Sequence, residues 1–269
     1  MSETFHHLHE SGCFVIPNPW DIGSARLLQQ LGFKALATTS SGFAWSMGRQ
    51  DNHVTLDEAL VHFRAIAASV EIPVNADFEG GFADAPEDVA TQVAAAAATG
   101  VAGLSIEDYN GEPADPLYEF ALSVERVRAA RRAIDASGHH VLLTARSEGF
   151  IVGRPDLAET IRRLTAYADA GADCLYAPGL RTIDDVRTVV TAVAPKAVNV
   201  LVGGPVFTVP QLADAGVRRI SVGGALARAA WGGFLDAAKE IAERGTFTAL
   251  GKAVPFAEIN ASFASRERP

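Results

Sequence analysis

The sequence lacks the features that mark secreted and membrane-spanning proteins. Among its 269 residues there are only two cysteines, Cys13 and Cys174, which excludes a disulfide framework. Both lie in apolar runs, so we expect two buried, reduced thiols. No stretch reaches the roughly 18 consecutive apolar residues of a membrane span, and residues 1–12 have neither the basic nor the apolar region of a secretory signal. A cytoplasmic protein without a membrane partner is therefore expected.

Basic residues are scarce as well. The chain has 23 Lys and Arg against 32 Asp and Glu, which gives a net charge of −9. This balance argues against a nucleic-acid partner, because general nucleic-acid binding depends on neutralising phosphates. It does not exclude a small anionic substrate, since one bound cation or one well-placed arginine can reverse the local field. Three N-terminal histidines, His6, His7 and His9, are expected on the solvated face of an amphipathic helix rather than at a metal.

Proline-rich linkers, low-complexity runs and a glycine-rich dinucleotide fingerprint are also missing. What is present is a repeated order of a helical segment, a small residue followed by glycine, and an apolar strand. It occurs at residues 31–35, 99–103, 170–174 and 215–219. In each copy the glycine supplies the positive φ that ends a helix. Strands that alternate with helices in this way pair in parallel.

This alternation predicts a single α/β domain. Eight strands are expected, at residues 13–16, 35–38, 72–76, 103–106, 141–145, 174–176, 198–202 and 219–222. Helices are expected near residues 24–30, 56–69, 86–98, 118–136, 156–168, 182–193, 208–213 and 225–243. Eight such units predict a (β/α)8 TIM-type barrel over residues 1–244. Residues 245–269 predict a C-terminal helical extension, whose apolar face must pack on its own barrel or on a partner subunit.

Charged residues follow three consecutive strands of the predicted barrel: Asp77 and Glu79, then Glu107, then Arg146. The loops after barrel strands meet on one face, where active sites lie. Three carboxylates there repel one another unless a cation lies among them, and oxygen-only ligands favour Mg²⁺ or Mn²⁺ over zinc. Arg146 could hold a substrate carboxylate in a bidentate pair. The alternatives are a structural salt bridge from Arg146 to Glu107 or Glu148, and acids that only cap helices or pair with surface arginines.

Small polar residues follow the second strand. Thr39, Ser40, Ser41 and Gly42 could offer N–H groups and hydroxyls to an anion, or could form no more than a turn. A divalent ion, an arginine and such a segment together describe a site for a small 2-oxo or 2-hydroxy acid. The metal would chelate the carboxylate and the adjacent oxygen, and would stabilise the enolate left when a bond at C3 breaks.

Five short stretches resemble the isocitrate lyase/phosphoenolpyruvate mutase superfamily. They follow one another in the order found in that superfamily, and the resemblance extends over nearly the whole chain. They are Pro-Asn-Pro-Trp-Asp-Ile-Gly-Ser-Ala-Arg at 17–26, Ser-Met-Gly-Arg-Gln-Asp at 46–51, Pro-Val-Asn-Ala-Asp-Phe-Glu-Gly-Gly-Phe at 73–82, Gly-Val-Ala-Gly-Leu-Ser-Ile-Glu-Asp at 100–108 and Thr-Ala-Arg-Ser-Glu at 144–148. The resemblance implies a Mg²⁺-dependent barrel enzyme that cleaves or forms C–C or P–C bonds next to an enolate. It also implies a homo-oligomer, commonly a tetramer, whose subunits exchange a C-terminal helix.

The resemblance also assigns roles to individual residues. Asp77 would bind the metal directly, Glu79 would act through water where the family usually has a second Asp, and Glu107 would be the third metal-side carboxylate. Asp51 matches a loop acid used near the reacting group; its alternative role is to cap the helix entered at Leu56. The catalytic candidates are therefore Asp51, Glu107 and Arg146. The substrate-binding candidates are Trp20, Thr39, Ser40, Ser41 and Arg146.

The chain departs from the family in one segment. Lyases of the family carry Lys-Lys-Cys-Gly-His in a mobile lid, with the Cys as acid/base. Here residues 108–115, Asp-Tyr-Asn-Gly-Glu-Pro-Ala-Asp, contain no Cys, Lys or His. The Lys that mutases and phosphonopyruvate-hydrolysing members place after the Glu-Asp pair is missing too.

A reaction that needs only a metal-stabilised enolate survives these losses best. We therefore expect a Mg²⁺-dependent lyase or decarboxylase on a small 2-oxo or 2-hydroxy di-acid such as oxaloacetate. The alternatives are a phosphonopyruvate hydrolase-like or mutase-like P–C bond enzyme, a 2-methylisocitrate lyase-like C–C lyase, and a barrel that binds 2-oxo acids without turning them over.

Overall fold

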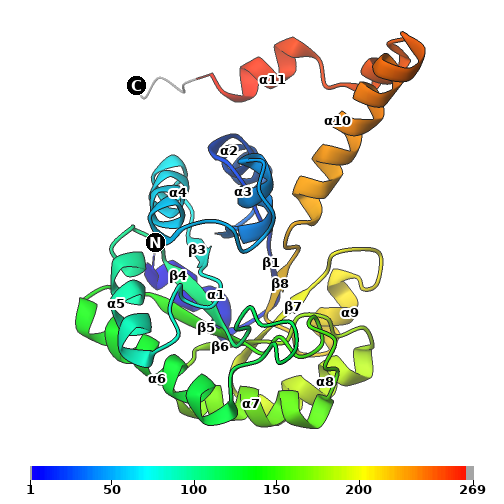
Figure 1. The fold of residues 1–269 in the computed structure, drawn as a ribbon. Helices are drawn as coiled ribbons and strands as arrows, with labels where there is room; N and C mark the ends of the chain where they lie inside the picture. Colours follow the sequence, from blue (N-terminus) through cyan, green and yellow to red (C-terminus); the bar gives the residue numbers. More distant parts are fainter. Residues whose placement is uncertain (1, 265–269) are drawn as a thin grey trace.

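The computed structural model describes residues 2–264 and contains one sheet of eight parallel strands surrounded by helices (Figure 1). The strands are β1 (Phe14–Ile16), β2 (Leu36–Ala37), β3 (Val74–Asp77), β4 (Gly103–Glu107), β5 (Leu142–Arg146), β6 (Cys174–Tyr176), β7 (Ala197–Leu201) and β8 (Arg219–Ser221). They pair in the order β1-β8-β7-β6-β5-β4-β3-β2. The sheet nearly closes, because the Ala37 N–H donates to the Pro17 carbonyl just past β1 at 3.1 Å. The predicted (β/α)8 barrel is confirmed.

Seven helices connect successive strands. They are α2 (Ile22–Gln30), α4 (Leu56–Ser69), α5 (Pro86–Ala97), α6 (Phe120–Ser137), α7 (Leu157–Asp169), α8 (Ile183–Val193) and α9 (Val209–Asp214). Their starts carry the expected caps: the side chains of Asp21, Thr55 and Thr182 each accept a hydrogen bond from a backbone N–H of the first turn. These caps fix where each helix leaves the rim of the barrel.

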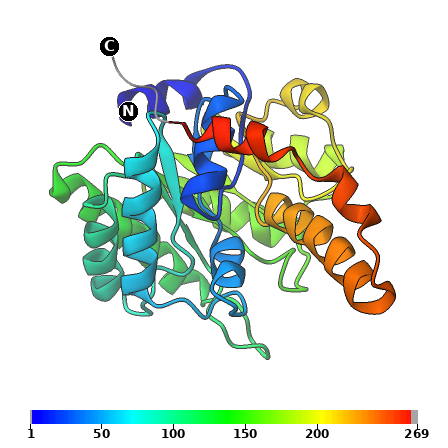
Figure 2. The ribbon, with the colours of Figure 1, turned by 90° about the horizontal axis from the view of Figure 1, so that it is seen from above.

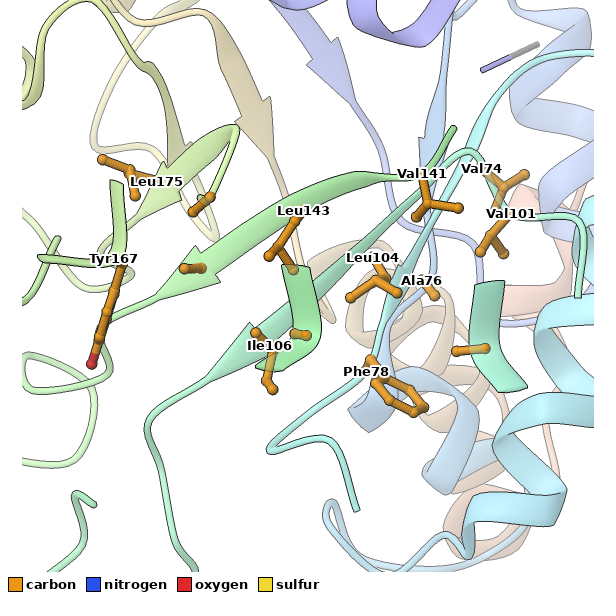
Figure 3. Close-up of a cluster of buried hydrophobic side chains, with 14 of the residues drawn as sticks. Val74, Ala76, Phe78, Val101, Leu104, Ile106, Val141, Leu143, Tyr167 and Leu175 are labelled. Carbon is orange, nitrogen blue, oxygen red and sulfur yellow. The ribbon is translucent and has the colours of Figure 1, made fainter. Parts of the chain in front are cut away.

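Alternation along the strands divides the side chains of the barrel into two sets. Successive side chains of a strand point to opposite faces. On β4, for example, Leu104 and Ile106 join the apolar cluster between sheet and helices (Figure 3), whereas Ser105 and Glu107 do not. β3 and β5 follow the same pattern. The apolar set therefore forms the core, and the polar set faces the lumen.

The helix α1 (Ser2–Glu10) packs where the strands begin. Its Phe5 is fully buried in a cluster with Ala35, Leu142 and Cys174, near the amino-terminal ends of their strands. The expectation that His9 lies on a solvated face is wrong. The His9 ring stands edge-on between Phe5 and Phe14, with centroid distances of 4.7 and 5.1 Å, because burial of Phe5 turns this face of α1 inward.

A short helix, α3 (Ser40–Ser46), forms where the sequence suggested only a turn or loop. Thr39 caps it and accepts from the Gly42 N–H at 3.3 Å. Phe43 of α3 stacks on His62 of α4, which anchors the helix to the outside of the barrel. The Ser40 N–H at the start of α3 donates to Asp77, the last residue of β3.

The C-terminal part of the chain forms two helices joined by a short 3-10 helix. α10 (Ala225–Arg244) leads away from the strands instead of covering β8 (Figures 1 and 2). The turn η1 (Thr248–Lys252) follows, and α11 (Phe256–Ser262) returns to α2, where the Gln30 amide donates to the Ser262 carbonyl. The boundary between barrel and extension at residue 245 stays a prediction, and residues 265–269 of the predicted extension lie outside the described residues.

Large apolar side chains remain uncovered along this extension; Phe234 is 58% and Phe256 is 85% exposed. Within residues 2–264, no helix has both the length and the apolar character required to cross a membrane.

The contact between α1 and β4 predicts a specific stability effect. A Cβ at Gly103 would lie 2.5 Å from the Phe5 ring and 2.8 Å from Asn75 Oδ1. We therefore expect Gly103→Ala to lower the free energy of unfolding by about 1–3 kcal/mol, the usual result of overpacking. Urea denaturation checks this. Gly203→Ala is the matched control, because nothing lies within 4 Å of its Cβ; an equal effect of both substitutions would contradict the packing explanation.

Candidate active site

Three charged residues end three adjacent strands on the same rim of the barrel. Asp77 is the last residue of β3, Glu107 of β4 and Arg146 of β5, and the register pairs Glu107 directly with Arg146. The Arg146 guanidinium is the centre of the group. Its Nη1 lies 2.7 Å from Asp77, its Nη2 3.0 Å from Glu107 and its Nε 2.8 Å from Glu148. The predicted convergence of these strand ends is therefore present, and the salt bridges to Glu107 and Glu148 are part of it.

Burial makes these charges interdependent. Burial raises the pKa of Glu107 well above its usual range and also raises that of Glu148, while Arg146 acts in the opposite direction on both. Burial alone would lower the pKa of Arg146, but the charges of Glu107, Glu148 and Asp77 raise it well above its ordinary value. The arginine is therefore the charge that allows several acids to share one buried site.

Asp77 and Asp51 meet at the start of α3. The Ser40 N–H donates to Asp77 Oδ2 at 3.0 Å, and Thr38 Oγ1 accepts from the Asp77 N–H at 2.9 Å. Burial and the charge of Asp77 raise the pKa of Asp51, while hydrogen bonds from Ser40 and Asn52 oppose this shift. The loop acid and the strand-end acid are thus close enough to influence one another.

Glu79 follows β3 with a positive φ of 47°, which is uncommon for a residue with a side chain. Burial, then the charges of Asp77 and Asp51, raise its pKa to about 8. The buried Arg126 of α6 holds the backbone of this loop, because its guanidinium donates to the carbonyls of Gly80, Ala83 and Asp84.

The rim opens into a cavity of about 170 Å³ that continues into the lumen. The candidates that line it are Thr39, Ser40, Ser41, Asp51, Asp77 and Arg146. Glu107 lies behind Arg146, and Glu79 is not part of the lining. Trp20 lies in a separate groove with Phe43 and Met47, between α2, α3 and α4.

Sequence reasoning missed part of the lining. These residues include Asn18, Asn75, Tyr176, Asn199, Arg219 and Ser221. The signal available for most of them was a polar side chain at an alternate position of an otherwise apolar strand, as at Asn75 and Asn199. With these residues the site extends from the rim of the barrel into its lumen.

The acids fit a divalent cation that keeps most of its waters better than a cation held entirely by protein ligands. Within residues 2–264, no three His, Cys, Asp or Glu side chains are placed to hold an ion together. The reason is that Asp77 and Glu107 both turn to Arg146. Mg²⁺, however, usually keeps several waters and takes only one or two carboxylates. Asp77, Glu79, Glu107 and Glu148 outnumber the single Arg146, so a cation would balance the site, with Asp77 and Glu79 as the residues that would hold it.

Asp108 fixes the corner that carries Arg146 and Glu148. It is buried and accepts from the Glu148 N–H at 2.8 Å, the Tyr167 hydroxyl at 2.8 Å and Arg163 Nη1 at 3.1 Å. Glu148 in turn pairs with Arg146 Nε. Asp108 therefore helps to hold Arg146 in place through Glu148. The sequence marked Asp108 only as the neighbour of Glu107.

This parallel barrel carries acids and an arginine at the carboxyl ends of consecutive strands. That arrangement is typical of barrel enzymes, whose active sites lie at this end of the strands. The profile of the family described as phosphoenolpyruvate phosphomutase matches residues 5–242, and the chain belongs to this family. The predicted membership of the isocitrate lyase/phosphoenolpyruvate mutase superfamily is confirmed, and with it an enzyme acting on C–C or P–C bonds.

Several known proteins are similar to this chain. The 2-methylisocitrate lyase of Escherichia coli (strain K12) is 31% identical over 205 residues, covering 72% of this chain and 68% of that protein. A crystal structure from Burkholderia cenocepacia J2315, provisionally described as a lyase/mutase, is 49% identical with a TM-score of 0.95 and covers 98% and 96% of the two chains. Oxaloacetate acetylhydrolase with bound oxalate is 25% identical with a TM-score of 0.86, covering 97% and 93%.

The Asp108 network predicts a large loss of stability on truncation. Asp108→Ala leaves the buried Arg163 with one carboxylate partner fewer and the Glu148 N–H without its acceptor. Breaking a buried ion pair in this way typically costs about 3–5 kcal/mol, which thermal and denaturant unfolding can measure. Asp184→Ala removes an ion pair on the surface and should leave the unfolding free energy nearly unchanged; similar losses in both variants would contradict the role given to Asp108.

Proposed function

We propose that this enzyme is a Mg²⁺-dependent lyase or decarboxylase acting on a small 2-oxo di-acid such as oxaloacetate. The observation that carries the proposal is the meeting of Asp77 and Arg146 at the mouth of a small polar cavity. Mg²⁺, when bound, supplies Lewis-acid stabilisation of the charge that develops on the enolate oxygen. The residues of the chain supply binding and orientation.

Arg146 can still bind a substrate carboxylate in this arrangement. A guanidinium has five N–H donors; Nε donates to Glu148 and Nη1 to Asp77, and Nη2 forms an ion pair with Glu107 at 3.0 Å. Nη1 and Nη2 both keep N–H groups that a substrate carboxylate can accept from. The hydroxyls of Thr39 and Ser41, 3.1 Å apart, line the same cavity at the start of α3 and offer further donors.

The size of the cavity supports a small substrate. Its volume of about 170 Å³ is well above the roughly 10–15 Å³ that a single water needs and below the roughly 300–1,000 Å³ of a pocket for a drug-sized ligand. A four-carbon acid fits this space. Asp77 is held on both sides, by Arg146 and by the Ser40 N–H, so its position does not depend on the ligand.

The lid segment favours decarboxylation over aldol-type cleavage. Residues 108–118 form a loop that is held by hydrogen bonds. Asn110 donates to the carbonyls of Asp115 and Pro116, and Arg154 donates to the Ala114 carbonyl. The segment has no Cys, Lys or His. Cleavage of a 2-hydroxy acid needs a base to remove the hydroxyl proton, whereas a 3-carboxyl group of a 2-oxo acid leaves as CO₂ without one. The oxaloacetate-cleaving and methylisocitrate-cleaving relatives support C–C cleavage in this fold.

We also propose that the enzyme works as a homo-oligomer in which α10 and the segments after it cover a partner's barrel. α10, η1 and α11 carry exposed apolar side chains that a second copy would bury. The family resemblance supports the same arrangement. Trp231 and Leu235 on α10 are part of this surface.

The metal role of Asp77 gives the first test. Wild-type protein should release pyruvate from oxaloacetate in Mg²⁺ and lose this activity in EDTA. Asp77→Asn should weaken Mg²⁺ affinity by at least about 10–100-fold, the loss already typical when only outer-shell partners are removed. Calorimetry with Mg²⁺ and a coupled pyruvate assay check the two effects.

The matched control is Asp184→Asn, an acid exposed on α8 that should bind Mg²⁺ and release pyruvate like wild type. A tube without protein gives the background rate of Mg²⁺ alone. Equal pyruvate release by wild type and Asp77→Asn would overturn the decarboxylase proposal. Turnover of phosphonopyruvate or 2-methylisocitrate instead of oxaloacetate would assign the site to those substrates.

The carboxylate role of Arg146 gives the second test. Arg146→Lys keeps the charge but loses the planar fork. We expect KM for oxaloacetate to rise about tenfold, corresponding to the loss of one charge-assisted hydrogen bond. Steady-state kinetics measure this, with Arg187→Lys as the control because Arg187 pairs with Asp184 on the surface. An unchanged KM in Arg146→Lys would remove Arg146 from the binding step.

A further inference from the structure

Arg219 is a buried cation without an acidic partner. It begins β8, is only 3% exposed, and has no Asp or Glu within ion-pair distance among residues 2–264. Its Nε donates to Asn199 Oδ1 at 2.9 Å and its Nη2 to Thr144 Oγ1 at 3.0 Å. The other buried site arginine, Arg146, has three carboxylates around it. A buried charge is normally paired; the buried Arg126 also lacks an ion pair but donates to three backbone carbonyls, whereas Arg219 lines a cavity.

The third guanidinium nitrogen is the least engaged. Nη1 of Arg219 lies 3.5 Å from Asn75 Oδ1 and 3.4 Å from His9 Nε2, both long for hydrogen bonds. His9 adds no negative charge. Its Nδ1 donates to the Phe5 carbonyl at 2.8 Å, which leaves Nε2 as a neutral acceptor. Burial and the charge of Arg219 lower the pKa of His9 to about 3, in agreement with a neutral ring.

Arg219 lines the same cavity as Arg146 and Asp77. α1 packs at the base of the barrel, with Phe5 fully buried there, so the cavity is reached from the rim. Between rim and base the lining includes the hydroxyls of Ser105 and Ser221, beside the apolar Ile16 and Leu201. An anion that enters from the rim therefore meets a cation at each end of a polar well.

We propose that Arg219, with Asn75 and Asn199, forms a second carboxylate subsite at the floor of the cavity, which selects di-acids over mono-acids. The assignment rests on the proposed function in one respect: it takes the ligand of the subsite to be the second carboxylate of the substrate. The carboxylate supplies the counter-charge that the chain does not. The two asparagines orient the guanidinium through their Oδ1 atoms, which accept from Arg219, while their Nδ2 groups donate to the Ala76 carbonyl and to Ser221 Oγ.

The subsite can be tested by binding alone, without metal or turnover. Calorimetry in EDTA compares malonate, a stable di-acid, with acetate and with sodium chloride. Wild type should bind malonate, and Arg219→Met should weaken this binding at least tenfold. Arg218→Met, the neighbouring arginine that donates to the Gly12 carbonyl outside the cavity, should leave it unchanged. Because no catalysis is measured, failure of the decarboxylase proposal would not alter the result.

A second variant covers the case in which Arg219→Met does not fold. Asn199→Asp is isosteric and places a carboxylate 2.9 Å from Arg219 Nε. It should raise the Tm, because it supplies the missing counter-charge, and should weaken malonate binding about tenfold by occupying the guanidinium. Unchanged malonate binding in either folded variant would overturn the subsite. Chloride or acetate binding as tightly as malonate, with the same loss in Arg219→Met, would assign the position to any small anion and overturn di-acid selection.

Discussion

The candidate site depends on one interaction, the contact of the Arg146 guanidinium with carboxylates from three different segments. β3, β4 and the corner after β5 deliver Asp77, Glu107 and Glu148 to it. Burial raises the pKa of Glu107 and of Glu148, and the charge of Arg146 opposes this rise in both. Arg146 is thus the positive charge around which the three carboxylates are held. The site is therefore organised before a metal or substrate arrives.

The second constraint is the alternation of side chains along the strands. Apolar residues such as Leu104 and Leu143 pack under the helices, and the residues between them line the lumen. Because these lumen residues are polar, the barrel interior is a well rather than a packed apolar core. The rim and the lumen thus belong to one site, with Arg146 at one end and Arg219 at the other. This links the proposed chemistry at the rim to the proposed recognition of a second carboxylate below it.

Much of the architecture could be predicted from local signals. Glycines after helical segments and apolar strands between them indicated the barrel, and charges after consecutive strands indicated the rim that holds Asp77, Glu107 and Arg146. The missing lid groups between residues 108 and 115 were visible directly. Two features were not predicted correctly: α3 in place of a turn and the inward face of His9. Each depends on packing against a distant segment.

The sequence by itself therefore determined the order of the elements, the face on which the acids gather and the chemistry that the lid cannot supply. These follow from periodicity, capping and residue type, which act over a few residues. Only the tertiary structure decided that Asp77 and Glu107 both turn to Arg146, that Trp20 lies in another groove, and that Arg219 is buried without an acid. Such contacts join residues far apart in the sequence, for example His9 and Arg219, which are 210 positions apart. Closure of the barrel brings these residues together.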